Sequence, residues 1–228
     1  MTNIVLPDTG HHSLAFYLAM EEFVASRFEG EAFFVWQSEP TVIYGRNQVL
    51  ENEVNIKFCQ EHGVRVVQRR SGGGCVYSDK GNIMISYVAK RGEVGEVFDR
   101  YLSALTGFLT SLGVQAVKSG RNDVLVDGRK VSGNAVQQLP DRTIAHGTLL
   151  HSTDFDALEQ AIKPPVEKLQ RHGVESVRQR VMNLSEVLPM PLEDLKKSLV
   201  KYFCDGEFVL SASDVDEIEN IEKEYKTI

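Results

Sequence analysis

Apolar positions recur every three or four residues along several parts of the chain, which is the spacing of an amphipathic helix. The longest such stretch spans 95–113 and ends at Gly113, and the clearest one near the start of the chain spans 12–28. A shorter stretch, 53–63, ends at Gly63, and glycine is common just beyond the end of a helix. Further helices are expected later in the chain, at 154–162, 191–203 and 213–225.

Short apolar segments bounded by glycine, proline and polar residues predict β-strands between these helices. Two hairpins are expected, one over 75–90 that turns at 79–81, and one over 123–133 that turns at Asp127-Gly128. The segment 163–181 is expected to be a long ordered loop. The remaining predicted strands lie at 31–38, 41–46, 64–70, 114–120, 143–152 and 207–211.

Strands in hairpins, with helices that stand apart from them, indicate an α+β fold rather than alternating βαβ units. Mixed or antiparallel sheets with flanking helices are therefore expected. A length of 228 residues suits a single domain, 1–228, with a full hydrophobic core. No stretch approaches 18 consecutive apolar residues, and the first residues lack the basic and apolar regions of a signal peptide. Neither a membrane span nor secretion is expected.

The charge distribution narrows the class of ligand. The net charge is −7, and residues 205–228 account for −6 of it, which leaves the rest of the chain at −1. A chain of this charge is not expected to bind nucleic acid in general, whereas local basic clusters in a nearly neutral body suit a small anionic ligand. The three cysteines are widely spaced and include no CxxC pair, which favours reduced thiols in a cytoplasmic setting.

Three consecutive glycines, Gly72, Gly73 and Gly74, follow the predicted strand at 64–70. Glycine loses more backbone entropy on ordering than any other residue, so a triplet needs a compensating use. Its main-chain N–H groups can bind phosphate or carboxylate oxygens, and the adjacent Arg69 and Arg70 would add charged donors. The loop matches neither the GxxxxGK[ST] nor the GxGxxG nucleotide motif, so a tight turn with solvated arginines remains an alternative.

The Asp127-Gly128 turn fixes the register of its hairpin by counting outward from the turn. This predicts four facing pairs and places an aspartate, a lysine and a serine on one face, with valines on the other. The alternative is an exposed hairpin with an ordinary surface ion pair, which contributes little to stability. The facing pairs are Val126 with Arg129, Leu125 with Lys130, Val124 with Val131, and Asp123 with Ser132, and the polar face holds Asp123, Leu125, Lys130 and Ser132.

Two further side chains could carry chemistry. His146 precedes a glycine in a predicted strand, although a lone histidine is more often structural than catalytic. Cys75 directly follows the glycine triplet, and a free cysteine usually behaves as a small buried hydrophobe. Neither residue defines a reaction by itself.

Five motifs occur in an order that resembles the lipoate–protein ligase family, over most of residues 12–203. The combination of GRND, KVSGNA and HGTLL is the most specific part. The resemblance implies the α+β catalytic domain that this family shares with biotin ligases and octanoyltransferases. The motifs are FYLAMEE, RRSGGGCVYSDKGN, SGRNDVLVDGRKVSGNA, HGTLL and VESVRQRVMNLSEVL.

The resemblance also implies an activity and a site. A lipoate ligase uses ATP and Mg²⁺ to convert lipoate into lipoyl-AMP. It then passes the lipoyl group to a lysine of apo acceptor proteins, such as E2 subunits of 2-oxoacid dehydrogenases and the H protein of glycine cleavage. Lys130 and Asp123 match the catalytic positions, and Asp123 also matches a Mg²⁺ ligand. The residues that match contacts to lipoyl-AMP or ATP are Arg69, Arg70, Ser71, Gly72, Gly73, Gly74, Val76, Asn82, Asn122, Lys130, Ser132, Gly133, Asn134, Ala135, His146 and Gly147.

The sequence departs from the family pattern in several places. Gln68 stands where an arginine is usual, with Arg70 as a partial substitute for its charge, and Ser78 stands where a histidine is usual. Tyr17 replaces a common asparagine, and Cys75 a common alanine. The family's C-terminal accessory domain is expected to be absent from 1–228, which leaves a separate accessory chain as an expected partner.

Two other functions remain open. One is an ATP-independent transfer of lipoyl or octanoyl groups through a cysteine thioester, for which Cys75 is the thiol nearest the predicted site. The other is a binding protein that holds lipoyl-AMP or an acceptor without turnover. Biotin ligation is disfavoured because the chain lacks a GRGRRGR-type loop.

Overall fold

A computed structural model describes residues 1–228 except 9, 121 and 164–179. Its described residues form an eight-stranded mixed sheet and a three-stranded sheet, with helices on both sides of the larger one, which confirms the expected α+β class. From edge to edge, the large sheet contains β11 (Gly206–Val209), β1 (Thr2–Val5), β2 (Ala32–Trp36), β6 (Asn82–Lys90), β10 (Arg142–Leu150), β9 (Arg129–Gln138), β8 (Asp123–Val126) and β7 (Ala116–Ser119).

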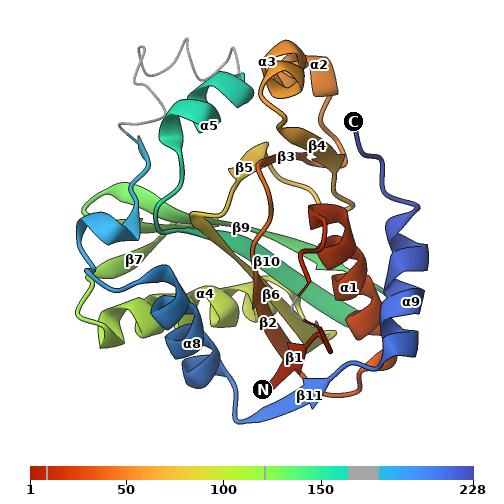
Figure 1. Ribbon diagram of the computed structural model, residues 1–228. Helices are drawn as coiled ribbons and strands as arrows, with labels where there is room; N and C mark the ends of the chain where they lie inside the picture. Colours follow the sequence, from red (N-terminus) through yellow and green to blue (C-terminus); the bar gives the residue numbers. More distant parts are fainter. Residues whose placement is uncertain (9, 121, 164–179) are drawn as a thin grey trace.

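The large sheet is antiparallel except at one edge, where β1 runs parallel to both of its neighbours. Helices α4 (Val94–Ser111) and α8 (Leu192–Phe203) cover one face, and α1 (Leu14–Arg27) and α9 (Ala212–Glu222) cover the other (Figure 1). Each face buries its own hydrophobic cluster against these helices. Removal of this apolar surface from water is the main stabilising contribution to such a layered arrangement.

Helix α1 is enclosed between the sheet and α9. The side chain of Ser13 caps it by accepting a hydrogen bond from the main-chain N–H of Phe16. Ten of its 14 residues are buried, which is why apolar residues occur around nearly its whole circumference. Glu21 is one of the ten, and a buried carboxylate in such a helix requires polar partners.

The small sheet lies at one end of the large one and has the order β4 (Arg65–Gln68), β3 (Thr41–Tyr44), β5 (Val76–Ser78). The helix expected at 53–63 forms as α3 (Ile56–Glu61), and a separate short helix, α2 (Leu50–Glu53), precedes it. The chain breaks between them because Asn55 caps α3 by accepting from the N–H of Phe58. Helix α5 (Phe155–Ala161) packs beside α3 over this sheet (Figure 1).

The predicted hairpin over 75–90 is wrong. Strand β5 pairs with β3 of the small sheet, whereas β6 pairs with β2 and β10 of the large one. The turn between them exists, with Asp79 accepting from the N–H of Gly81, but it passes tightly beneath the end of β10. A Cβ on Gly81 would lie 2.2 Å from the carbonyl oxygen of Ser152. This crossing directs the two strands into different sheets.

The hairpin of β8 and β9 has the predicted turn but only half of the predicted register. Asp127 and Gly128 have φ angles of 50° and 75°, as a type I′ turn requires, and Leu125 faces Lys130. Beyond that pair, a β-bulge makes Val131 an extra residue, so that Asp123 faces Gly133 instead of Ser132.

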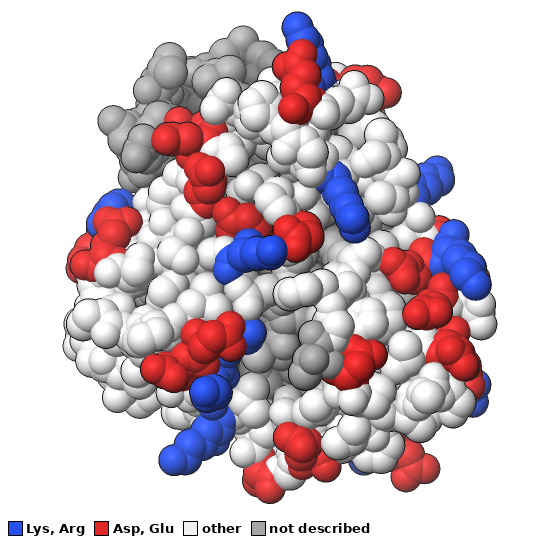
Figure 2. All heavy atoms as spheres, in the orientation of Figure 1, with Lys and Arg blue, Asp and Glu red and all other residues white. Residues whose placement is uncertain are grey.

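The last elements agree with their predicted positions, including α8, β11 and α9, and Gly113 ends α4 with a φ of 83°. Most of the loop expected at 163–181 lies outside the described residues. Acidic side chains gather over α9, on the right-hand side of Figure 2. None of the described helices is both long and apolar enough to span a lipid bilayer.

The contact between β9 and β10 leaves no space for a side chain at Gly147. A Cβ there would lie 1.9 Å from Oδ1 of Asn134, a buried side chain that accepts a hydrogen bond from Tyr101. We expect Gly147→Ala to lower the free energy of unfolding in urea by about 1–3 kcal/mol, the usual cost of overpacking. Gly95→Ala in α4 is the control, because nothing lies within 4 Å of its Cβ. Equal stability of the Gly147 variant and the wild type would contradict this packing.

Candidate functional site

Two neighbouring cavities lie between the small sheet and the β8–β9 hairpin. The first measures about 610 Å³ and the second about 1080 Å³, both counted with the space open to solvent. The first has an apolar part formed by side chains from α1, both sheets and the glycine-rich segment, and the second includes the carboxylate of Asp123. The apolar lining of the first consists of Leu18, Trp36, Ile43, Val76 and Met84, and the residues common to both cavities are Cys75, Val76, Lys130, Gly133 and Thr148.

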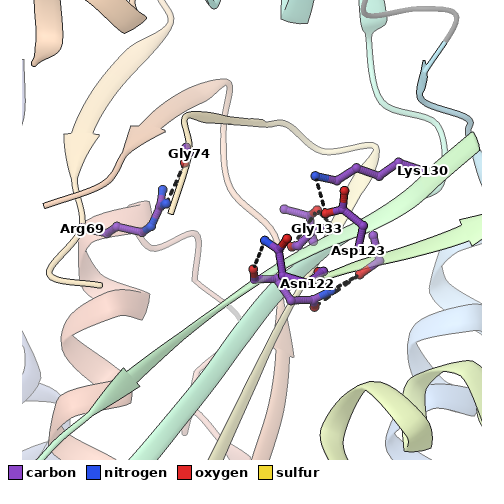
Figure 3. A network of polar contacts seen from close by, with 9 residues as sticks. Arg69, Gly74, Asn122, Asp123, Lys130 and Gly133 are labelled. Atoms are coloured by element: carbon purple, nitrogen blue, oxygen red, sulfur yellow. Dashed lines mark hydrogen bonds and ion pairs between the residues drawn. The ribbon is translucent and has the colours of Figure 1, made fainter. Parts of the chain in front are cut away.

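The glycine loop (residues 71–75) is held in place by Arg69. Its guanidinium donates to the carbonyl oxygens of Gly72 at 2.8 Å and Gly74 at 2.6 Å (Figure 3), and to that of Ile43 at 3.3 Å. Arg69 is 5% exposed, and its burial lowers the pKa of the guanidinium to about 10. Because these carbonyls are bonded to Arg69, the loop is ordered by its own neighbouring residue.

The shape of the glycine loop depends on the absence of side chains at particular positions. Gly73 has a φ of 95°, which favours glycine, and a Cβ there would lie 2.9 Å from the Arg69 guanidinium. Within the described residues, the main-chain N–H groups of Gly72, Gly73 and Gly74 donate no hydrogen bond. These N–H groups are available to an anion, as the sequence suggested.

Lys130 and Asp123 lie opposite the glycine loop, on the hairpin (Figure 3). Lys130 Nζ is 2.9 Å from Asp123 Oδ1, and both side chains are about one third exposed, at 35% and 32%. The bulge places Gly133 beside this pair, where a Cβ would lie 2.5 Å from Nζ and Cε of Lys130. The glycine therefore provides the space in which the lysine side chain lies.

A network of asparagines fixes the segment next to Asp123. Asn122 Nδ2 donates to the carbonyl of Asn134 at 2.7 Å, and Asn134 Nδ2 donates to the carbonyl of Asn122 at 3.0 Å. The hydroxyl of Tyr101 donates to Asn134 Oδ1 at 3.0 Å, and Ser132 also bonds to this amide. Since Asn134 is 4% exposed, these bonds stabilise a buried amide that anchors the start of β8.

His146 belongs to a second buried network, which borders the first cavity. Its Nδ1 lies 2.8 Å from Glu21 Oε2 and its Nε2 lies 2.8 Å from the Ser71 hydroxyl. Glu21 also accepts from Ser86, which in turn accepts from the indole N–H of Trp36 at 2.9 Å. With a proton on Nδ1, His146 donates to Glu21 and accepts from Ser71, which ties α1, β10 and the glycine loop together.

Most of the predicted site residues meet at these cavities, and a few do not. The first cavity is lined by eleven of them, and Asp123 lines the second. Arg70, Ser71, Gly72, Asn82 and Ser132 line neither. The eleven are Arg69, Gly73, Gly74, Val76, Asn122, Lys130, Gly133, Asn134, Ala135, His146 and Gly147.

Each residue outside the cavities is occupied elsewhere. Arg70 is bonded to Glu22 and Glu224, Ser71 to His146, and Ser132 to Asn134. Asn82 is fully buried and its amide donates to the carbonyl oxygen of Tyr77, while the carbonyl oxygen of Gly72 accepts from Arg69.

Sequence reasoning missed Glu21 and Trp36. A signal existed for Glu21, because it lies three residues after Leu18 and three before Val24, on the apolar face of α1. No comparable signal distinguished Trp36 from other strand residues, since its contribution to the cavity depends on how β2 meets α1 and the small sheet.

Asp123 can contribute to a Mg²⁺ site but cannot form one alone. Among the described residues, no group of three or more histidine, cysteine, aspartate or glutamate side chains could hold a metal ion. Mg²⁺ at nucleotide sites is usually held by one or two carboxylates together with substrate phosphates and water. Asp123 supplies one such carboxylate, about one third exposed and facing the second cavity, so it fits as one ligand of that arrangement.

Cys75 lies at the boundary of both cavities but is a poor nucleophile. Burial raises the pKa of its thiol to about 12, in spite of the nearby Arg69. The thiolate is the reactive form, so at neutral pH this cysteine is almost wholly protonated.

Comparisons with known proteins identify the family of this chain. Residues 13–204 match the family model of the lipoyl protein ligase A/B catalytic domain. The chain is 36% identical over 216 residues to the lipoate-protein ligase LplJ of Bacillus subtilis, covering 92% of this chain and 64% of that protein. It is also 36% identical over 220 residues to lipoate–protein ligase 1 of Staphylococcus aureus, covering 92% and 67%. The chain thus spans about two thirds of the length of these relatives.

Solved structures support the same fold. A bi-partite lipoate protein ligase from Thermoplasma acidophilum superposes with a TM-score of 0.85 at 23% identity, covering 98% of this chain and 92% of that one. A lipoate-protein ligase A bound with ATP gives a TM-score of 0.85 at 21% identity, covering 98% and 94%. The motifs, the family match and the curated relatives agree, and the chain belongs to the lipoyl protein ligase A/B catalytic domain family.

Proposed function

We propose that this chain is a lipoate–protein ligase, which activates lipoate with ATP and transfers the lipoyl group to a lysine of an acceptor protein. The observation that carries the proposal is the position of Lys130. Its ammonium lies where the two cavities meet, 2.9 Å from Asp123 and opposite the glycine loop. A cation at this junction can contact a carboxylate from one cavity and a phosphate from the other.

The lining of each cavity suits one substrate. The apolar side chains of the first cavity, including Trp36 and Met84, can bury the hydrocarbon chain and dithiolane of lipoate. The free main-chain N–H groups of the glycine loop, of which Gly73 and Gly74 line the first cavity beside Lys130, suit the phosphates of ATP, and the adjoining second cavity suits its nucleoside. The carboxylate end of lipoate would then lie next to Lys130.

In the first step, an oxygen of the lipoate carboxylate attacks the α-phosphorus of ATP, the bond to the β-phosphate breaks, and pyrophosphate leaves. Two anions must approach each other, and Lys130 reduces that repulsion and stabilises the negative charge on the oxygens of the α-phosphate. The loop amides hold the phosphoryl oxygens, so most of the rate enhancement would come from positioning. Mg²⁺, held by Asp123 and the phosphates, would supply further charge neutralisation.

In the second step, the amine of an acceptor lysine attacks the carbonyl of lipoyl-AMP, an amide forms, and AMP leaves. Lys130 stays within reach of the leaving phosphate and remains non-covalent throughout. Asp123, a hydrogen-bond acceptor next to Lys130, is placed to orient the incoming amine. The Thermoplasma acidophilum ligase is described together with its E2 lipoyl domain, which supports lipoyl domains as the acceptors here.

That relative is also described as bi-partite, which supports a separate accessory chain as a partner of this one. Such a partner would assist the activation step. Acceptors of the H-protein type would present their lysine to the same junction.

Lys130→Ala tests the first step. We expect this variant to form lipoyl-AMP at least about 100- to 1,000-fold more slowly than the wild type, because it loses the charged donor at the reacting phosphate. The measurement is pyrophosphate release and lipoyl-AMP formation from lipoate and ATP. Lys118→Ala is the matched control, since Lys118 on β7 pairs with exposed Asp99 away from both cavities. Full activity of a folded Lys130→Ala protein would refute the assignment.

Cys75→Ala separates the ligase from a transferase that works through a thioester. The raised pKa of the Cys75 thiol disfavours a thiolate nucleophile, so we expect the variant to keep at least about half of the wild-type transfer rate. The measurement is lipoylation of an apo acceptor domain with ATP, and separately with octanoylated carrier protein in place of ATP. Loss of transfer from the carrier protein in this variant, with no ATP requirement in the wild type, would favour the transferase.

A further inference from the structure

Arg69 and Arg70 are adjacent in sequence but serve different parts of the molecule. Arg69 is turned toward the glycine loop, whereas Arg70 donates from Nη1 to Glu22 on α1 and from Nη2 to Glu224 at 2.7 Å. The Arg70 guanidinium also lies over the ring of Tyr225, 4.8 Å from its centroid. Both arginines lie just beyond the end of β4, where the chain bends into the glycine loop.

The contacts of Arg70 form a closed cluster. The hydroxyl of Tyr225 donates to the second oxygen of Glu22, so Arg70 and Tyr225 bond to the same carboxylate. Glu22 is 17% exposed, and burial together with this carboxylate raises the pKa of Tyr225. We name Arg70, Glu22, Glu224 and Tyr225 the Arg70 clamp. A planar guanidinium that bonds to two carboxylates and also stacks on a ring is geometrically specific, unlike a single surface ion pair.

The main chain reinforces the clamp. After α9 the chain returns to the small sheet, and residues 226–228 run along the free edge of β4, where the C-terminus lies in Figure 1. The N–H of Val66 donates to the carbonyl of Ile228, the N–H of Ile228 donates back to Val66, and the N–H of Gln68 donates to Lys226. The segment 223–228 therefore covers the strand that leads directly into the glycine loop.

Main-chain hydrogen bonds on both sides of Arg70 connect the Arg70 clamp to the glycine loop. The N–H of Arg69 donates to the carbonyl of Tyr44, and the N–H of Arg46 donates to the carbonyl of Ser71, at 3.0 Å each. Between these two bonds lies Arg70, and the next residues are the glycines whose carbonyls Arg69 holds. A displacement of Arg70 would therefore move both ends of the hydrogen-bonded frame of the loop.

We propose that Arg70 is a positioning residue, which couples the segment 223–228 to the glycine loop and so sets the fraction of molecules in which the loop is ordered for ATP. Its effect on ATP rests on the proposed function, whereas its effect on the order of the loop does not. The triplet of glycines gives the loop a large entropy to lose, so external fixation of its base favours the binding conformation. Arg70 itself does not contact the substrates.

The experiment compares Arg70→Ala, Tyr225→Phe and a control in two measurements. The first is amide hydrogen exchange of Arg46 and Arg69 in the ligand-free protein, followed by NMR, because these two N–H groups frame the loop. The second is KM for ATP and kcat in the adenylation reaction. Arg27→Ala is the control, since Arg27 also joins α1 to α9, through an exposed ion pair with Glu217 at 2.8 Å.

We expect both amides to exchange faster in Arg70→Ala, and KM for ATP to rise about tenfold with kcat within about twofold, because apparent affinity falls with the fraction of competent molecules. Tyr225→Phe, which loses only the hydroxyl bond to Glu22, should change both measurements in the same direction by less. It also keeps the test decisive if Arg70→Ala folds poorly. Arg27→Ala should leave both unchanged.

Wild-type exchange rates at Arg46 and Arg69 in both clamp variants would overturn the proposal, whatever the activity. An Arg27→Ala effect as large as that of Arg70→Ala would also overturn it, since any link between α1 and α9 would then suffice. A wild-type protein that forms no lipoyl-AMP would refute the ligase function alone, and the exchange rates would still decide the role of the clamp.

Discussion

The ion pair between Lys130 and Asp123 depends on a glycine beside it, and that glycine depends on a β-bulge. Without the bulge, Ser132 would face Asp123, and its side chain would occupy the space that Lys130 now fills. With the bulge, Ser132 turns into the core and Gly133 takes its place. One additional residue in a strand thus places a cation where the two cavities meet, and bulges commonly redirect side chains next to active sites.

The same region shows how buried polar groups can hold a flexible loop without a ligand. The amide of Asn134 anchors one side of the site, and the chain of bonds from Trp36 through Glu21 and His146 to Ser71 anchors the other. Polar groups in a low-dielectric interior are costly unless all are bonded, so a satisfied network of this kind specifies one arrangement. The glycine loop between them can then be free of side chains and still be ordered.

Local signals in the sequence predicted local features well. The Asp127-Gly128 turn and the end of α4 at Gly113 follow from backbone preferences that these residues carry in any context. The pairing of Leu125 with Lys130 followed from the turn, but the bulge at the next residue, Val131, did not. The bulge lies next to the pairing of β9 with β10, where Gly147 faces Asn134. The sequence of the β8–β9 hairpin alone does not indicate that pairing.

Two other differences between the prediction and the structure also depend on contacts that local sequence does not indicate. In the sequence, β5 and β6 resemble a hairpin because a turn separates two apolar segments. The segments themselves do not indicate that β5 joins the small sheet and β6 the large one. Arg69 and Arg70 looked like a pair of anion-binding residues, but they lie beyond the end of β4 and bond to different parts of the molecule. Arg69 bonds to the loop that directly follows it, whereas Tyr225, which lies against Arg70, comes from a part of the chain far away in sequence.

The central claim is that the residues around Lys130 activate lipoate with ATP and then transfer it. The most direct measurement is the mass of an apo lipoyl-acceptor domain after incubation with this protein, lipoate and Mg²⁺, with and without ATP. The account predicts a gain of one lipoyl group that requires ATP and is accompanied by pyrophosphate, or, if activation needs a partner chain, a gain from synthetic lipoyl-AMP. No gain with either ATP or lipoyl-AMP would contradict it.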